Sequence, residues 1–276
     1  MEKLEHFTAI DFFLSETARH ADVILAGSLQ EEDEGTVTTG EGRCVRLRNS
    51  VSPAGNARLD WHIIRDLAIR LGAGEYFNHK NAEDIFLELT AASAGGPIDY
   101  SGMSYDRIER EMGIFWPCPA TDHPGTLRLF EKGKFAHPDG RAKFHAFPYR
   151  PPDEDVDRDF PLFFTSGRVV SQYLSGTQTR RIGSLVEQYP EPLCELHPLL
   201  AERLGITKGD IVRVSTRRGH IKVPAQIVQS IRPDTVFIPY HWPGKKAANR
   251  ITNRALDPIS KIPEFKVCAC KVEKVN

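Results

Sequence analysis

The sequence predicts an α/β segment, the end of a doubly wound domain, followed by a mainly β, barrel-like domain. Residues 22–26 have the apolar run of a buried parallel strand, and residues 60–71 have the spacing of an amphipathic helix. After residue 157, short apolar runs alternate with Gly-containing turns, which is typical of a small closed barrel. We therefore predict three parts: residues 1–74, an irregular and helical connection over 75–157, and the barrel over 158–276.

The helix predicted over residues 60–71 has an apolar face of five side chains at helical spacing, and Gly72 closes it. Those side chains are Trp61, Ile64, Leu67, Ala68 and Leu71. Earlier in the chain, residues 9–14 are a candidate strand, and Ser15 is placed to cap a helical turn that follows. These elements give the first part its α/β character.

The connection over residues 75–157 has weaker signals. Residues 81–92 form a predicted helix that Asn81 caps, and residues 105–112 form a shorter one. The apolar face of the longer helix is expected from Ile85, Phe86 and Leu89. Residues 151–155 are rich in proline and acidic side chains, which predicts a polar, extended linker before a boundary near Asp157.

The barrel is predicted from short strands with turns between them. A short helix over residues 198–204 ends at Gly205, and turns are expected at residues 208–210 and 218–219. The strands are expected at residues 160–165, 211–215, 221–228, 236–239 and 267–275. Such a set of strands suits a barrel of roughly six strands.

The composition excludes several classes of function. A formal net charge of −1 argues against wholesale binding to nucleic acid or to an anionic membrane. No apolar run approaches the roughly 20 residues that span a bilayer, and residues 1–6 lack the apolar stretch of a signal peptide. We therefore expect a cytoplasmic protein that uses neither nucleic acid nor membrane as a partner.

The cysteines predict neither a disulfide framework nor a metal site, because they are odd in number and mostly scattered. They are Cys44, Cys118, Cys194, Cys268 and Cys270. Strand alternation would put Cys268 and Cys270 on one face, where free cysteine behaves as a small buried hydrophobe. No catalytic residue and no metal ligand is predicted in this chain.

Three polar clusters in the barrel part are the candidate functional residues. The first is Thr165, Ser166, Gly167 and Arg168 after a strand, the second runs from Ser175 to Arg181, and the third spans residues 249–266. Hydroxyl, glycine and arginine residues at strand ends suit a ligand with phosphate oxygens. In the loop after residue 240, the ring of Trp242 could stack on a flat heterocycle.

A plainer interpretation stands beside each cluster. The first two can be solvated polar turns, and the third can be a long surface loop. Residues 35–43 favour an exposed loop with a Gly-supported turn over a second ligand surface. From the residues alone, an anion or nucleotide site and a solvated surface both stay open.

Several motifs resemble the C-terminal portion of the molybdopterin oxidoreductases that carry a bis(guanine dinucleotide) cofactor. Residues 13–18 (FLSETA) with residues 21–25 (ADVIL) are similar to one family passage, and residues 57–61 (ARLDW) and 138–142 (PDGRA) to two others. The resemblance extends to Gly35, Thr36, Glu41 and Arg43, although Thr39 stands where the family has asparagine. It covers nearly the whole chain.

The barrel part is similar to the family's dinucleotide-binding domain, which implies a barrel of the double-psi type. The resemblance implies that Arg168, Thr177, Thr179 and Arg180 contact phosphate and guanine, and that Trp242, Asn249 and Lys266 face the pterin. The full set of cofactor-binding residues it implies is Thr165, Ser166, Gly167, Arg168, Ser175, Gly176, Thr177, Gln178, Thr179, Arg180, Trp242, Asn249, Lys266, Gly35, Thr36, Glu41 and Arg43.

Within the family, the chain is most similar to cytoplasmic nitrate reductases, with formate dehydrogenases next. The family's iron–sulfur cysteines and molybdenum ligand lie upstream of the matching region, so the resemblance implies a fragment or one polypeptide of a split enzyme, inactive alone. Its partners would be that upstream part and an electron-transfer protein. The alternatives are a non-catalytic cofactor-binding or assembly module and a barrel for another nucleotide.

Overall fold

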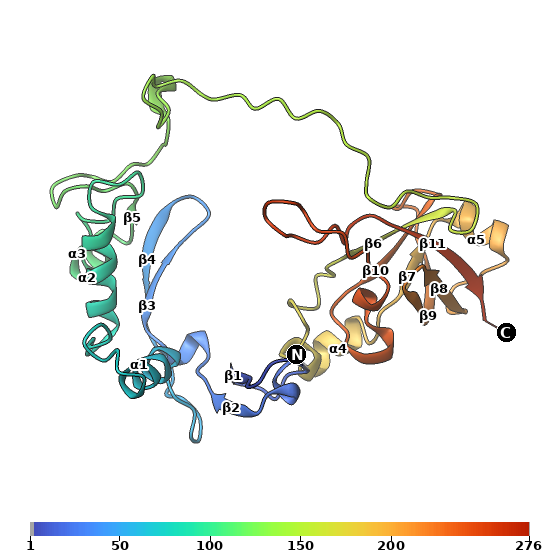
Figure 1. Cartoon of the computed structure of the whole chain (residues 1–276), viewed down its shortest axis with the longest axis horizontal. Coiled ribbons are helices and arrows are strands. Elements are labelled where there is room, and N and C mark those ends of the chain that lie inside the picture. Colours follow the sequence, from blue (N-terminus) through green and yellow to red (C-terminus); the bar gives the residue numbers. More distant parts are fainter. Residues whose placement is uncertain (1–2, 276) are drawn as a thin grey trace. The chain divides into compact units, whose positions relative to one another are not determined.

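The computed structural model describes residues 3–275 and divides the chain into two units, Met1–Ala146 and Phe147–Asn276 (Figure 1). Each unit has its own cluster of buried apolar side chains. The first unit mixes helices and short strands, and the second is a mainly β unit built on a closed six-stranded barrel. The predicted succession of an α/β segment and a barrel is confirmed.

The first unit begins with a small parallel sheet of β1 (Thr8–Asp11) and β2 (Val23–Ala26). The connection contains η1 (Ala18–His20), and the Ser15 hydroxyl accepts the amide of Ala18 at 3.2 Å, as predicted. The prediction that residues 22–26 are buried was wrong, because Val23 and Ile24 are 42% and 43% exposed. Two strands alone do not cover the faces of a sheet.

The helices of this unit are α1 (Asp60–Arg70), α2 (Ala82–Ser93) and α3 (Tyr105–Arg110), close to their predicted ranges. The Asn81 side chain caps α2 by accepting the amide of Asp84 at 2.8 Å. The predicted apolar faces were wrong in part. In α1 the buried apolar residues are Ile63 and Ala68, whereas Leu71 is 83% exposed. Spacing shows where apolar residues gather, but the neighbouring elements decide which of them are covered.

Residues 35–43, expected as an exposed loop, instead begin a β-hairpin. β3 (Gly35–Thr38) pairs with β4 (Arg43–Leu47), which also pairs with β5 (Ile114–Phe115) in an antiparallel sheet. A short turn, η2 (Gln30–Glu32), precedes the hairpin, and η3 (Glu131–Gly133) follows the sheet along the chain. The buried core beside this sheet contains Cys44, Phe86, Met103, Tyr105, Ile108, Ile114 and Cys118.

The second unit is a closed barrel with the strand order β10-β6-β11-β8-β9-β7 (Figure 1). Its strands are β6 (Leu162–Gly167), β7 (Cys194–Leu196), β8 (Ile211–Thr216), β9 (Gly219–Ile227), β10 (Thr235–Pro239) and β11 (Cys268–Lys274). Five of the six were predicted, and the missing one, β7, has only three residues. All five cysteines are free and buried, which confirms the burial predicted for Cys268 and Cys270.

Short helical elements lie between the strands. They are η4 (Thr179–Arg181), α4 (Gly183–Gln188), α5 (Pro198–Leu204), η5 (Gly244–Lys246) and η6 (Ala248–Arg250). Helix α5 begins with the His197 ring, which accepts the amide of Leu199 at 3.1 Å, and ends at Gly205 with a φ of 62°. Its predicted bounds are confirmed.

Strand pairing in the barrel determines where the polar clusters lie. β6 and β10 are parallel neighbours, with Ser166 opposite Ile238 and Gly167 opposite Pro239, so their carboxyl ends lie side by side. β11 runs antiparallel to β6 and begins at Cys268, opposite Phe164. The loops after β6 and β10 and the residues just before β11 therefore meet at one end of the barrel.

Candidate functional site

A pocket of about 430 Å³ lies at this end of the barrel. It is lined by Arg168, Tyr240, Asn249, Thr252, Asn253, Pro263, Phe265 and Lys266, and we call it the strand-end pocket. Three residues predicted from two separate clusters, Arg168, Asn249 and Lys266, are brought together here although they are far apart in sequence. Tyr240 was not predicted, and its position directly after a strand was the only signal for it.

Two cations of the strand-end pocket are held in place by neutral partners. Lys266 Nζ donates to the Ser166 carbonyl at 2.5 Å, and Arg168 Nε donates to the Tyr240 hydroxyl at 2.9 Å. Neither cation has a carboxylate partner within the described chain. Their positive charge therefore remains available for an anionic ligand.

Buried polar atoms without partners lie on the same residues or beside them. Ser166 is 2% exposed and Asn253 is 7% exposed, yet Ser166 Oγ and Asn253 Nδ2 have no hydrogen-bond partner among residues 3–275. Such atoms are rare in folded proteins because desolvation without a hydrogen bond is costly. Their presence beside two cations indicates a site for a ligand that both accepts and donates hydrogen bonds.

His241 ties the loop after β6 to the loop after β10. Its Nε2 accepts the amide of Val169 at 2.9 Å, so Nδ1 carries the proton and donates to the Leu174 carbonyl at 2.5 Å. The ring is fully buried, and this burial lowers the pKa of His241 below its ordinary value, with the charge of Arg168 acting in the same direction. The neutral imidazole thus organises the second polar cluster.

The second cluster, residues 175–181, folds back on this histidine. Gly176 has a φ of +72°, and a β-carbon there would lie 2.8 Å from the His241 carbonyl, so only glycine fits without strain. The hydroxyls of Ser175 and Thr177 hydrogen-bond each other at 2.9 Å. Gln178 is exposed at the start of η4, and buried Arg180 Nε has no partner.

Thr179 makes its hydrogen bonds to other residues of the protein. Its hydroxyl donates to the Gln172 side chain at 2.8 Å and accepts the amide of Tyr173 at 3.0 Å. Gln172 is 5% exposed, and its Nε2 atom has no partner. Gln172 was not predicted as a site residue, although it offers a buried donor next to the predicted loop.

The remaining predicted residues lie elsewhere. Trp242 packs its ring against Tyr189 at a centroid distance of 5.5 Å. Thr165 and Gly167 belong to β6, where a β-carbon on Gly167 would come within 2.6 Å of the Phe237 ring. In the first unit, Gly35 and Thr36 are in β3, whereas Glu41 and Arg43 form an ion pair at 3.1 Å.

A buried ion pair braces one wall of the strand-end pocket. Arg218 pairs with Glu154, the two side chains being 12% and 10% exposed, and its Nη2 also donates to the Ile251 carbonyl at 3.1 Å. The amide of Ala269 donates to Glu154 at 2.7 Å. We call this arrangement the Glu154–Arg218 clamp.

The clamp keeps Glu154 ionised. Burial alone would raise the pKa of Glu154, but the hydrogen bonds from Arg218 and Ala269 outweigh it, so the pKa lies below its ordinary value. The linker over residues 151–155 was predicted as polar and extended, and the sequence carried no signal that one of its acidic residues is buried. Because Ile251 directly precedes Thr252 and Asn253, the clamp fixes the position of two residues of the pocket.

The described residues offer neither a metal site nor a membrane-spanning helix. Among residues 3–275, no group of three or more histidine, cysteine, aspartate or glutamate side chains is arranged to hold a metal ion. In the same part of the chain, every helix is too short or too polar to cross a membrane.

Comparison with known families adds to this geometry. Residues 162–269 match the molydopterin dinucleotide binding domain, and residues 1–70 match the molybdopterin oxidoreductase family. The chain is 49% identical to the assimilatory nitrate reductase catalytic subunit of Bacillus subtilis, over 99% of this chain and 38% of that protein. It is 41% identical to the F420-dependent formate dehydrogenase subunit alpha of Methanocaldococcus jannaschii, over 100% of this chain and 40% of that protein.

The fold also has a solved counterpart. Acetylene hydratase from Pelobacter acetylenicus superposes with a TM-score of 0.73 at 21% identity, over 98% of this chain and 40% of that one. At this identity the likeness concerns the fold. The chain therefore spans about two fifths of the length of the relatives that it matches.

Proposed function

Because two stretches of this chain belong to the molybdopterin oxidoreductases and to their dinucleotide-binding domain, we propose that it binds a molybdopterin guanine dinucleotide cofactor that carries molybdenum. The observation that carries the proposal is the strand-end pocket, where cations without carboxylate partners adjoin buried polar atoms without partners. A dinucleotide supplies phosphate oxygens for the cations and base or pterin edges for the buried atoms. When bound, the cofactor supplies two-electron chemistry at its metal.

We assign the residues by their chemistry. Arg168, with Arg180 and Thr177 of the neighbouring loop, would hold phosphate groups through charge-assisted hydrogen bonds. Lys266, Asn249 and Trp242 would face the pterin. Thr179 would contact phosphate or guanine from the same loop. The remaining predicted residues of the barrel would shape the loops around the ligand; they are Thr165, Ser166, Gly167, Ser175, Gly176 and Gln178.

For the first unit, taken by itself, the hairpin is proposed as a cofactor-binding surface. Gly35, Thr36, Glu41 and Arg43 gather on β3, on β4 and in the turn that joins them. Arg43 is held by Glu41 and by the Phe115 ring, 4.8 Å from the guanidinium carbon. Its role rests on the family match of residues 1–70 alone.

For the whole enzyme we propose nitrate reduction, supported by the relative of 49% identity, with formate oxidation as the alternative supported by the relative of 41% identity. The chain covers about two fifths of these relatives, so we propose that it needs the remaining part of the large subunit and an electron-transfer partner for turnover. Five free cysteines are consistent with a reducing compartment, and we propose the cytoplasm.

The decisive test is chemical. The chain is purified from a host that makes the cofactor, and acid treatment should release GMP in a stoichiometric amount. The Arg168→Gln variant should lose most of this GMP, whereas Lys208→Gln, on an exposed turn far along the sequence, should keep it. Release of another nucleotide, or equal GMP content in both variants, would contradict the proposal.

A second assay separates an enzyme part from a non-catalytic module. Nitrate and formate are offered to the chain with reduced or oxidised viologen dyes, with and without a polypeptide that carries the remaining part of the relatives' large subunit. We expect turnover only when both polypeptides are present. Cofactor binding without turnover in the combined sample would favour the cofactor-binding or assembly module instead.

A further inference from the structure

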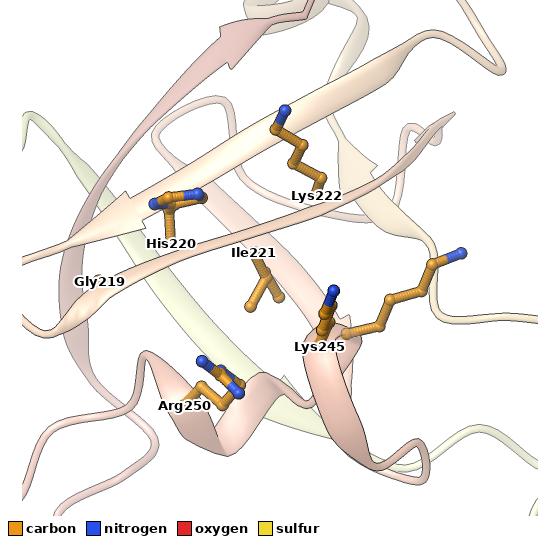
Figure 2. Close-up of a pocket in the computed structure, with 7 residues that line it drawn as sticks. Gly219, His220, Ile221, Lys222, Lys245 and Arg250 are labelled. Carbon is orange, nitrogen blue, oxygen red and sulfur yellow. The ribbon is translucent and has the colours of Figure 1, made fainter.

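A second pocket, of about 580 Å³, lies at the start of β9 (Figure 2). One of its lining residues, Arg250, lies within the third polar cluster, but none of them is among the residues assigned to the cofactor. It is lined by Gly219, His220, Ile221, Lys222, Lys245, Lys246 and Arg250. An adjoining hollow of about 260 Å³ shares Gly219, His220 and Arg250 with it and adds Arg218 and Arg254. We call the two together the basic groove.

The basic groove carries cations that the protein itself does not neutralise. Lys222, Lys245, Arg250 and Arg254 are exposed and make no ion pair or side-chain hydrogen bond within residues 3–275. Arg218 is paired with Glu154, and Lys246 with Glu191. Because no acidic residue lines either hollow, the groove presents a strongly positive surface on a chain whose net charge is −1.

These cations come from three separate elements. His220 and Lys222 belong to β9, Lys245 to η5 and Arg250 to η6, and Figure 2 shows them around one hollow. Ile221 between the two β9 side chains is part of the barrel core. A rigid strand on one side and two short turns on the other therefore hold the charges apart along the groove.

The basic groove is distinct from the strand-end pocket, although one segment contributes to both. Asn249, Thr252 and Asn253 line the pocket, whereas Arg250 and Arg254 line the groove. The segment over residues 249–254 thus presents neutral amide and hydroxyl groups to one ligand site and guanidinium groups to the other.

We propose that the basic groove docks an extended acidic segment of a protein partner. Single charges distributed along two adjoining hollows match successive carboxylates of an extended chain better than one compact phosphate. Exposed lysines are strongly hydrated charges on flexible stems, which suits steering and reversible association. The proposal does not depend on the cofactor, since none of the four unpaired cations is assigned to it.

The test uses the full chain and a labelled decapeptide of alternating glutamate and aspartate, with a decapeptide of glutamine and asparagine as control. Fluorescence anisotropy is recorded at low salt and at about 300 mM salt, where the Debye length falls to about 6 Å. The acidic peptide should bind at low salt and lose about tenfold or more in affinity at high salt, as expected for exposed charges. The neutral peptide should not bind.

Matched charge reversals localise the binding. The double variant Lys222→Glu with Arg250→Glu should weaken binding of the acidic peptide at least tenfold, because it lowers the charge of the groove by four units. The control Arg203→Glu with Lys208→Glu changes the net charge equally, on the exposed side of α5 and the turn after it, and should retain binding. Circular dichroism verifies that both variants are folded.

Three results would overturn the proposal. The first is an unchanged affinity of the groove variant for the acidic peptide, and the second is an equal loss of affinity in the control variant. The third is displacement of the peptide by inorganic pyrophosphate at a concentration well below that of the peptide. The last result would assign the groove to a small phosphate ligand. The Arg168→Gln variant should keep peptide binding even if it loses GMP, so failure of this proposal and failure of the cofactor assignment are distinguishable.

Discussion

The strand-end pocket and the basic groove share a wall, yet their cations have different surroundings. In the pocket, Arg168 and Lys266 are held by a tyrosine hydroxyl and a backbone carbonyl, beside buried atoms without partners. In the groove, Lys222 and Arg250 are exposed and make no side-chain hydrogen bond or ion pair within residues 3–275. All four of these residues are exposed, so the two sites differ in the partners of the cations and in the buried polar atoms beside them. Buried polar atoms with incomplete hydrogen bonding are typical of a site prepared for one specific ligand, whereas exposed charge without a partner is typical of reversible electrostatic contact. Charge alone therefore does not distinguish the two kinds of site.

The largest loss of stability is expected from breaking the Glu154–Arg218 clamp, which lies between the pocket and the groove. The Glu154→Gln variant leaves Arg218 without its charged partner at low exposure, and removal of one partner from such a pair costs about 3 kcal/mol of unfolding free energy. The urea-unfolding midpoint measures this loss, and GMP content should fall with it because Ile251 is released.

The neighbouring Asp155→Asn variant is the control for the clamp. Asp155 is exposed and accepts only the amide of the next residue, so its stability should change by less than about 0.5 kcal/mol. Equal unfolding midpoints for the two variants would show that Glu154 does not brace the pocket wall.

Gly176→Ala sharpens the comparison on the side of the pocket. The new β-carbon would lie 2.8 Å from the His241 carbonyl at a φ of +72°, so we expect a loss of about 2 kcal/mol from the left-handed backbone and the clash together. Thermal unfolding of Gly183→Ala provides the control, since a β-carbon there meets no atom within 4 Å. Binding of the acidic peptide to the groove should be unaffected by either change.

A pH series tests the buried His241, which joins the loops after β6 and β10. Burial lowers the pKa of His241 in the folded state, so the unfolded chain takes up the proton more readily. The stability that this ring contributes is present above its unfolded pKa of about 6.5 and is lost as the pH falls below that value. Unfolding midpoints at several pH values should therefore fall less steeply with acid in His241→Gln than in the wild type.

The exposed, non-titrating Gln178 provides the control for this series. The Gln178→Ala variant should keep the wild-type dependence on pH, because it removes no ionisable group. A wild-type slope in His241→Gln as well would mean that the buried ring does not govern acid sensitivity.

The smallest effect is expected at Ser166. Its buried hydroxyl has no partner, so Ser166→Ala removes an unsatisfied group and should leave the unfolding free energy of the cofactor-free chain unchanged or raise it by up to about 1 kcal/mol. The same variant should retain less GMP than the wild type. A marked loss of stability without the cofactor would show that the hydroxyl has a hydrogen-bond partner in solution. The pocket would then have one fewer of the unpaired buried atoms that distinguish it from the groove.

Sequence alone predicts those features that depend on local chemistry. Asn81 and Gly205 mark the ends of their helices through side-chain capping and a left-handed backbone, and both signals lie within a few residues. The six-stranded barrel also follows from strand and turn signals, except for the three residues of β7. The likeness of the polar clusters to a known family then indicated the cofactor.

Features that depend on distant partners were not predictable. The exposure of Leu71 and of β2 depends on what packs against them. The hairpin of β3 and β4 was not predicted because its glycine- and threonine-rich sequence resembles that of a loop. The burial of Glu154 depends on Arg218, 64 positions away. Spacing within one segment carries no information about such contacts.

The segment over residues 249–254 gives one side of its chain to each site, and this has a thermodynamic consequence. A ligand that orders the segment from the pocket side changes the conformational entropy that the segment loses when a second ligand binds in the groove. Such coupling is reciprocal: the factor by which a bound dinucleotide alters affinity for an acidic peptide is the factor by which that peptide alters affinity for the dinucleotide. Cofactor binding would then change the affinity of the groove for its partner without being required for docking.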